Sequence, residues 1–184
     1  AHWSELRAGS EIPKDQHEEI NLQLDPINEY FFDVIQNGSN FDQEDHEANV
    51  DLAIGTGALI AEESEDPEKD VEFRSVPLPE LVLEGGPFST VGGVFWPRVM
   101  TNGDIKGMWP KAEISKEMSD DIRDNPDKEI TIVTATLRDR SAKQEEHDFK
   151  VFSLQHQEII FEDRLVGSGS SPWIIFRWST SSSE

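Results

Sequence analysis

Cysteine is absent from the 184-residue sequence, which excludes both a disulfide framework and a metal site built from thiolates. No apolar run approaches the ~20 residues that a membrane-spanning helix requires. The first residues, AHWSELRAGSE, have neither the basic start nor the apolar stretch of a secretory signal peptide. These absences predict a protein that suits a reducing compartment and has no membrane segment.

Basic residues are scarce, with 16 Lys and Arg against 38 Asp and Glu and a net charge of −22. Tight binding of nucleic acid needs clustered cations that neutralise phosphates, whereas Lys106, Lys116 and Arg123 are scattered singly. We therefore expect no tight wrapping of nucleic acid. A surface that lets DNA slide past would instead repel phosphate. Adaptation to salt, or a need for solubility, explains the acidity equally well, and composition leaves these alternatives open.

Apolar residues are also few, at 35% of the chain compared with about 45–50% in ordinary globular domains. The length corresponds to one domain of ordinary size or two small ones. We expect a thin core, with part of the apolar surface covered by neighbouring subunits. The sequence starts without Met and stops soon after an apolar run, so a piece of a longer chain is expected.

Helical spacing dominates the first third of the sequence. A pattern that starts at Asp15 meets Asp25-Pro26, which resembles an N-cap followed by proline at the first helical position. The residues that follow predict one apolar face, formed by Ile27, Tyr30, Phe31, Val34 and Ile35. Asn37-Gly38 is expected to end this helix, and Ser39-Asn40 to cap a second one from Phe41 to about Ala53.

Short strands follow the helices. Apolar runs bounded by turn residues predict strands at 58–63, 71–76, 81–83, 91–100, 129–137, 149–154, 158–163 and 173–178. Gly92-Gly93 and Pro97 place the fourth of these strands at a sheet edge or a bulge. One further helix, from about Lys111 to Asp124, is expected between the two groups of strands. This order of elements predicts an α+β fold.

Three short segments have residues that are used elsewhere in catalysis or metal binding. Gly55-Thr56-Gly57 lacks the lysine and the strand-to-helix setting of a phosphate-binding loop, which favours a tight turn. Asp42 and His46 share a helix face and are compatible with a metal site, but acids are also favoured at a helix start. The acids of residues 62–72 lack the spacing of a calcium loop. With no GxSxG or HExxH motif, we expect no catalytic residue, metal or cofactor, although a serine–histidine–acid site assembles in space and stays open.

Several segments, in order, resemble the T7-like podovirus family of head-to-tail connecting (portal) proteins. They are Trp3 with Leu6, SNF (39–41), DLAIGTGALIAEE (51–63), FRSVPLPELVLEG (73–85), GGVFWPRVMT (92–101) and PWIIFRWST (172–180). The resemblance covers nearly all of this chain but only the middle part of a typical member. Ile54 departs from the aromatic residue that members often have before GTG, and the acidity is unusually high. The residues that carry the resemblance are Trp3, Ser39, Asn40, Phe41, Asp51, Leu52, Gly55, Thr56, Gly57, Pro77, Leu78, Pro172, Trp173, Arg177 and Trp178.

The resemblance implies a non-enzymatic subunit of a ring, usually of twelve copies, at one vertex of the capsid. DNA passes through such a ring during packaging and ejection, and the ring docks the terminase motor, the tail adaptor, and capsid and scaffold proteins. The implied sections are a wing at 1–100, a stem helix at 101–128, a clip at 129–165 and a return strand at 166–184. The implied location is the virion, after assembly in the host cytoplasm.

A charged helix with a narrow apolar stripe is what a channel-lining stem helix packed against ring neighbours would look like. Ile114, Met118 and Ile122 form such a stripe on the helix expected at 111–124. The residues expected to face the channel or a neighbouring subunit are Glu113, Lys116, Asp120, Asp121, Arg138 and Arg140. Two alternatives stay open: an acidic metal-binding or hydrolase domain, and a salt-adapted adaptor domain.

Overall fold

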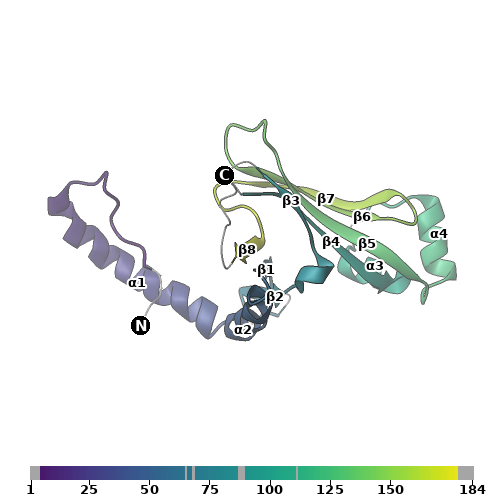
Figure 1. Cartoon of the computed structure of the whole chain (residues 1–184), viewed down its shortest axis with the longest axis horizontal. Helices are drawn as coiled ribbons and strands as arrows, with labels where there is room; N and C mark the ends of the chain where they lie inside the picture. The colour runs from purple at the N-terminus through teal and green to yellow at the C-terminus, as the bar shows by residue number, and fades with distance from the viewer. Residues whose placement is uncertain (1–4, 65, 68, 87–89, 111, 178–184) are drawn as a thin grey trace.

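The computed structural model describes residues 5–177 except 65, 68, 87–89 and 111. Two residues of the resemblance, Trp3 and Trp178, lie outside this set, and Arg177 is described by its backbone alone. The described chain has four α-helices and two antiparallel sheets, which confirms the predicted α+β fold (Figure 1). The helices are α1 (His17–Gln36), α2 (Phe41–Leu52), α3 (Asn102–Met108) and α4 (Lys116–Asp124). Short 3-10 turns, η1 (Lys14–Gln16) and η2 (Leu78–Glu80), complete the helical elements.

The smaller sheet has the strand order β2-β1-β8. It consists of β1 (Thr56–Glu63), β2 (Val71–Ser75) and β8 (Trp173–Arg177), and α2 packs against β1 and β2. Both pairings are antiparallel, and β8 joins β1 although the two strands are more than a hundred residues apart in the sequence. The end of the described chain therefore completes a sheet that begins near residue 56.

The larger sheet is an antiparallel meander of five strands in sequence order. Its strands are β3 (Val82–Gly85), β4 (Val91–Thr101), β5 (Glu129–Arg138), β6 (Glu146–Ser153) and β7 (Glu158–Val166). β4 pairs with β5 from Gly93 to Thr101, so the sheet continues across the predicted boundaries at residues 100 and 128. The division into wing, stem and clip stays a prediction, but it does not separate two sheets.

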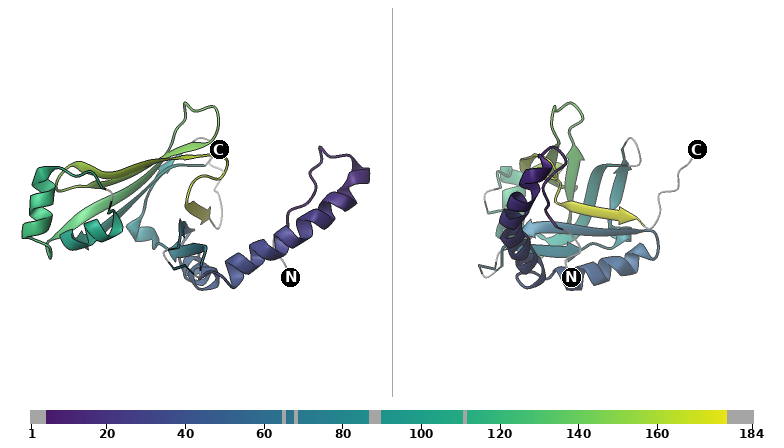
Figure 2. Two further views of the ribbon diagram at one scale, coloured as in Figure 1. Left: turned by 180° about the vertical axis from the view of Figure 1, so that it is seen from behind. Right: turned by 90° about the vertical axis from the view of Figure 1, so that its left-hand side faces the viewer.

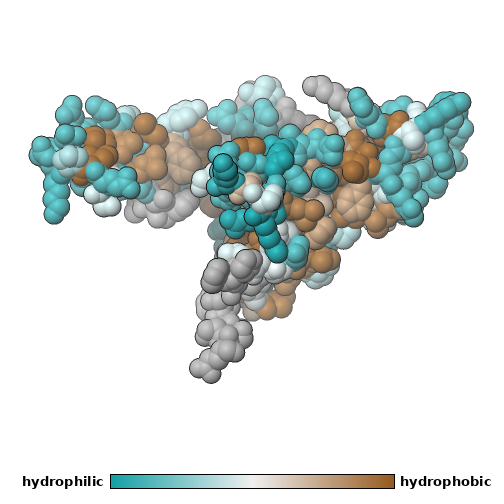
Figure 3. Space-filling view, turned by 90° about the horizontal axis from the view of Figure 1, so that it is seen from above, coloured by the Kyte–Doolittle hydropathy of each residue, from teal (hydrophilic) through white to brown (hydrophobic). Residues whose placement is uncertain are grey.

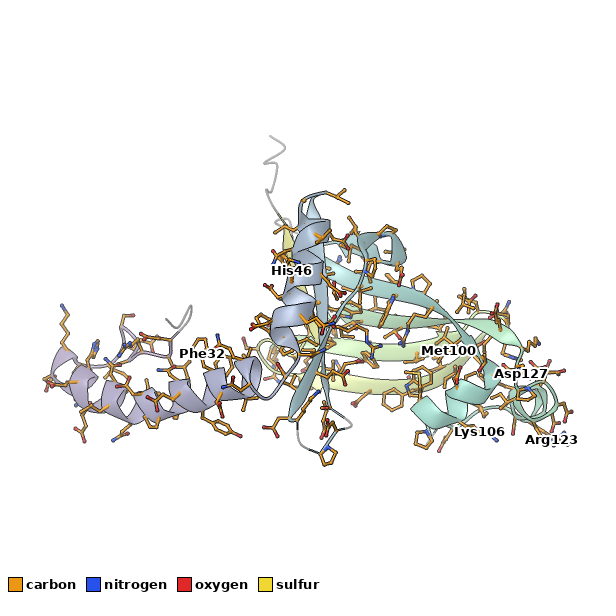
Figure 4. The ribbon with its side chains drawn as sticks, turned by 90° about the horizontal axis from the view of Figure 1, so that it is seen from below. Phe32, His46, Met100, Lys106, Arg123 and Asp127 are labelled. Carbon is orange, nitrogen blue, oxygen red and sulfur yellow. The ribbon has the colours of Figure 1, made fainter. Side chains whose placement is uncertain are left out.

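Two apolar cores lie against one face of the five-stranded sheet. The first joins the two sheets and contains Ile60, Val94, Trp96 and Trp173, and the Trp96 and Trp173 rings meet edge to face at 5.8 Å. The second lies under α3 and α4 at the far end of the sheet, where Ile105, Met118, Ile122, Ile130, Ile132, Val151 and Ile160 are buried. Figure 4 shows α2 crossing this side, with α3 and α4 at the opposite end.

The segment 101–128 differs from the predicted helix at 111–124. A capping box of Thr101 and Asp104 starts the unpredicted α3, and Ser115 accepts a hydrogen bond from the Met118 N–H at the start of α4. Met118 is 0% exposed and Ile122 is 5% exposed. The stripe of Ile114, Met118 and Ile122 therefore packs on the chain's own sheet. The narrow width of this stripe is thus no evidence for contact with a neighbouring subunit.

The helix start expected at Asp25-Pro26 is wrong, because α1 begins at His17 and runs through Pro26. Proline in a helix interior removes one backbone hydrogen bond. The preceding segment bridges the two halves of α1 across this point: Ala8 N–H donates to Asn21 Oδ1 at 2.8 Å, and Leu6 N–H donates to Asn28 Oδ1 at 2.7 Å. These contacts hold the helix together on both sides of the proline.

The predicted bulge or edge in β4 is confirmed. Glu84 pairs with Gly93 and Gly85 with Val91, so Gly92 is the extra residue of a bulge. Pro97 pairs with Val133 of β5, whereas the pairing with β3 reaches only to Phe95. At Pro97, β4 therefore has a described strand on one side alone, as is usual for proline within a strand.

Candidate interaction surfaces

The SNF segment fastens α2 to the edge strand β2. The Asn40 amide Nδ2 donates to the Phe73 carbonyl at 2.7 Å, and the Phe73 N–H donates back to Asn40 Oδ1 at 2.8 Å. Phe41 and Phe73 pack edge to face at 5.0 Å. Asn40 occupies the N-cap position of α2, as predicted for Ser39-Asn40, but its side chain binds β2 and makes no cap hydrogen bond. Ser39 acts in that place: its Oγ accepts from the Phe41 N–H at 3.1 Å and donates to the Ile35 carbonyl at the end of α1.

Carboxylates of α2 hold the segment that follows β2. Asp51 Oδ2 accepts from the Leu78 N–H at 3.1 Å, so two residues of the resemblance, Asp51 and Leu78, meet directly. Glu44 Oε2 accepts from the Ser75 N–H at 2.6 Å. Sequence reasoning missed Glu44, which had no pattern to distinguish it from the other acids of α2. Pro77 precedes Leu78 at the start of η2, and Leu52 is half-buried at the end of α2.

Gly55-Thr56-Gly57 forms the predicted turn from α2 into β1. Gly55 has a φ of 141°, a conformation that favours glycine. A Cβ on Gly57 would lie 2.4 Å from the Phe176 ring and 2.8 Å from the Ala48 carbonyl oxygen. Thr56 pairs with Arg177 in the β1–β8 ladder. Gly55 thus permits the turn, and Gly57 permits close packing between α2, β1 and β8.

The last segment of the resemblance connects the two sheets. The Ala61 N–H donates to the Pro172 carbonyl at 2.9 Å. Trp173 Nε1 donates to Thr136 Oγ1 of β5 at 3.1 Å, a buried hydrogen bond between the sheets. The described residues that carry the resemblance therefore converge on α2, the three-stranded sheet and the segment after β2, where they hold backbone in place.

Helix α1 projects away from both sheets (Figures 1 and 2). We call residues 5–36, which comprise the lead-in segment and α1, the arm. Helical spacing places Ile20, Ile27, Tyr30, Phe31 and Val34 along one side of α1, and we call this set the arm stripe. Ile27 is 50% exposed, Tyr30 65% and Phe31 46%. The apolar face predicted for this helix exists, but the described chain leaves much of it uncovered.

The second face of the five-stranded sheet is the other uncovered apolar surface. Both cores lie on the opposite face, and no described helix or strand lies across this one (Figures 1 and 3). The cross-strand registers place one set of apolar side chains on it, which we call the open face: Val82, Phe95, Pro97, Val99, Val133, Ala135, Leu137, Phe152 and Ile159. Val82, Val99 and Ile159 are exposed, whereas Val133 and Ala135, on the central strand β5, are only 6% and 2% exposed. Seen from above, apolar surface gathers over this sheet and along α1 (Figure 3).

Four of the residues expected to face a channel lie around α4. Glu113 and Lys116 are exposed, and Asp120 pairs with Arg123 at 2.9 Å. Asp121 is engaged within the chain: Lys128 Nζ donates to its Oδ2 at 2.7 Å, and Asn125 Nδ2 donates to its Oδ1 at 2.9 Å. These hydrogen bonds, of which the one from Lys128 has the largest effect, lower the pKa of Asp121 to about 2. Asp121 therefore has a structural partner set that ties α4 to the start of β5.

The other two, Arg138 and Arg140, lie at the hairpin between β5 and β6. Arg140 pairs with Glu84 of β3 at 3.2 Å, which braces the hairpin against the sheet. Arg138 is exposed and makes no ion pair with a described residue. The hairpin also contains Asp139, whose carboxylate binds Arg164. Its charges are therefore mixed, and it presents no concentrated basic surface.

One cavity of about 440 Å³ is lined by Thr136, His147 and Trp173 among others. Near it, His147 Nδ1 lies 3.0 Å from Ser170 Oγ, while His147 Nε2 lies 4.0 Å from Glu145 Oε1. The second distance is too long for a hydrogen bond. Glu145 instead accepts from the Gly169 N–H at 3.2 Å. This serine–histidine–acid group fastens the loop before β8 and lacks the aligned hydrogen bonds of a nucleophilic site.

Asp42 and His46 lie on the exposed side of α2, where Figure 4 labels His46. The described residues contain no group of three or more His, Cys, Asp or Glu side chains that is arranged to hold a metal ion. None of the helices in the same residues is long and apolar enough to span a bilayer.

The motif residues have structural roles, and two apolar surfaces are not covered by described elements. Both features are typical of a component of a protein assembly. The family of the bacteriophage head to tail connecting protein matches residues 1–184. The chain belongs to this family. The family is structural and not enzymatic, and it implies an oligomer that assembles with phage head and tail components. No curated protein matches the chain.

Proposed function

We propose that the chain is a subunit of a T7-like portal ring at one capsid vertex, through which DNA is packaged and ejected. The observation that carries the proposal is the family match over residues 1–184. The order and spacing of the motif segments resemble the T7-like subfamily, and this resemblance is the basis for proposing that subfamily and a ring of about twelve copies. The proposed partners are the terminase motor, the tail adaptor, and capsid and scaffold proteins, with the virion as the final location.

The uncovered apolar surfaces support assembly of several copies. Exposed apolar patches mark contact sites, and apolar side chains are exposed along the arm stripe and at Val82, Val99 and Ile159 of the open face. The net charge of −22 supports passage of DNA without tight binding, because an acidic wall repels phosphate. A sheet shared by residues 82–101 and 129–166 favours one rigid body in the ring wall.

The test is the assembly state of the full-length gene product. Mass photometry and negative-stain microscopy are expected to show closed rings with a central channel, and in an electrophoretic assay the rings are expected not to retard duplex DNA at physiological salt. A full-length protein that stays monomeric at every concentration and salt tested, or that turns over a substrate, would contradict the proposal.

A further inference from the structure

We infer that the arm of one copy docks its stripe on the open face of the next copy in the ring. The inference rests on the proposed function, because it takes assembly of several copies as given. It adds which two surfaces meet and in which direction the copies are joined.

The arm stripe cannot be buried by the arm itself. The lead-in segment packs on a different side of α1, where Asn21 and Asn28 accept the hydrogen bonds from Ala8 and Leu6. Asn28 is 4% exposed there, whereas Ile27 beside it is 50% exposed. The lead-in thus covers one side of the helix and leaves the stripe free for another partner.

The arm is held away from its own open face. Ser39 ties the end of α1 to the start of α2, and a Cβ at Gly38 would lie 2.9 Å from the Val34 carbonyl oxygen, so this turn is tight. α2 in turn is fastened to β2 by Asn40. The resulting direction of α1 leads outward from the body (Figures 1 and 2).

The two surfaces match in length. A helix of 20 residues is about 30 Å long, and β4 and β5, with 11 and 10 residues, extend over about 33–36 Å. Half of the lateral surface of a helix about 10 Å wide and about 30 Å long is roughly 500 Å². Covering it together with an equal area of sheet buries roughly 1,000 Å², the lower bound for a specific interface.

Charge favours arm-on-sheet over arm-on-arm contact. α1 contains five acids, Glu18, Glu19, Asp25, Glu29 and Asp33, and no Lys or Arg. Two arms side by side would therefore bring like charges together. The open face has charges of both signs: Lys150 lies 4.0 Å from Glu162, and Arg164 pairs with Glu146 at 2.7 Å. An acidic arm therefore meets less repulsion there than beside a second arm. In addition, a closed ring needs two different surfaces that complement each other, whereas self-pairing of one arm stops at a dimer.

Cross-linking tests the contact directly, because the chain has no cysteine of its own. In the full-length protein, Ile27→Cys is combined in turn with Val82→Cys, Phe95→Cys and Val99→Cys, and the rings are treated with a short bifunctional thiol reagent. At least one pair is expected to give a ladder of multimers larger than dimers. The matched control is Leu22→Cys with the same partners, because Leu22 is 66% exposed on the side of α1 opposite Phe31. Dimers from Ile27→Cys alone, or rings without any ladder, would overturn the inference.

A charge substitution separates this inference from the proposed function. Ile27→Asp is expected to raise the concentration needed for ring formation about tenfold or more, because a carboxylate would be buried without a partner. Leu22→Asp is expected to change it by less than about threefold, and thermal melts of the monomers check that both variants fold. Rings that form equally well with both substitutions refute the arm contact and leave the proposed function intact. Absence of rings in the unmodified protein refutes the proposed function itself.

Discussion

The side-chain amide of Asn40 pairs with the backbone of Phe73 on both of its hydrogen-bonding groups, as a neighbouring strand would. β2 is an edge strand of the three-stranded sheet, and an unpaired edge exposes backbone groups to other chains. Asn40 thus completes the edge at one residue and, in the same contact, anchors α2 and the arm to the sheet.

Asn40→Ala is expected to lower the free energy of unfolding by about 2 kcal/mol, because both Phe73 backbone groups lose their partner beside a buried ring. Chemical denaturation followed by circular dichroism measures the change. Asn49→Ala on the exposed side of α2 is the control, with an expected change within about 0.5 kcal/mol. Equal effects of the two substitutions would show that the Asn40 contact contributes nothing specific.

Gly57→Ala is expected to destabilise the fold by about 1–3 kcal/mol. The added Cβ meets the Phe176 ring, which can move, and the Ala48 carbonyl at 2.8 Å, which is helix backbone and cannot move freely. Gly107→Ala in α3 serves as the control, because nothing lies within 4 Å of its Cβ position and alanine is favoured over glycine in a helix. A thermal melt is expected to shift down for the first variant and to stay level or rise for the second.

Asp121 is expected to make stability depend on pH in the acid range. Its pKa is about 2 in the folded chain, below the ordinary aspartate value of 3.8, so its contribution to stability is fully present above about pH 4. The contribution is lost as pH falls through the folded pKa and the carboxylate is protonated. Denaturation curves measured between pH 6 and pH 2 give the free energy of unfolding of the wild-type chain and of Asp121→Asn. The difference between the two is expected to shrink as pH falls. A constant difference across that range would contradict the assignment, and Asp127→Asn at an exposed position is the control.

Trp173→Phe tests the connection between the two sheets. The substitution keeps an aromatic ring beside Trp96 but removes the donor to Thr136, which is 2% exposed. Loss of a buried hydrogen bond is expected to cost about 1–3 kcal/mol. Thr136→Val removes the other partner, and the double variant is expected to be less destabilised than the sum of the two single ones. Strictly additive values would mean that the hydrogen bond does not couple the sheets.

Most elements were predictable because their signals are local. Apolar runs bounded by turn residues predicted β5 and β7, and the glycine pair in β4 predicted its bulge, since each pattern reports on the residues that carry it. The helix start expected at Asp25-Pro26 was wrong because the lead-in segment, through Asn21 and Asn28, holds the helix on both sides of Pro26. α3 was missed because its seven residues include two glycines and carry little apolar periodicity.

By itself the sequence determined the fold class, the positions of nearly all strands and the series of motifs that points to the family. These depend on the spacing of neighbouring residues and on residue type. Tertiary structure alone decided that β8 completes the sheet of β1 and that Met118 and Ile122 are buried against the chain's own sheet. It also decided that the arm stripe and the open face have no described element packed over them. The physical reason is that burial depends on what packs against a face, and residues far apart in the chain supply that partner.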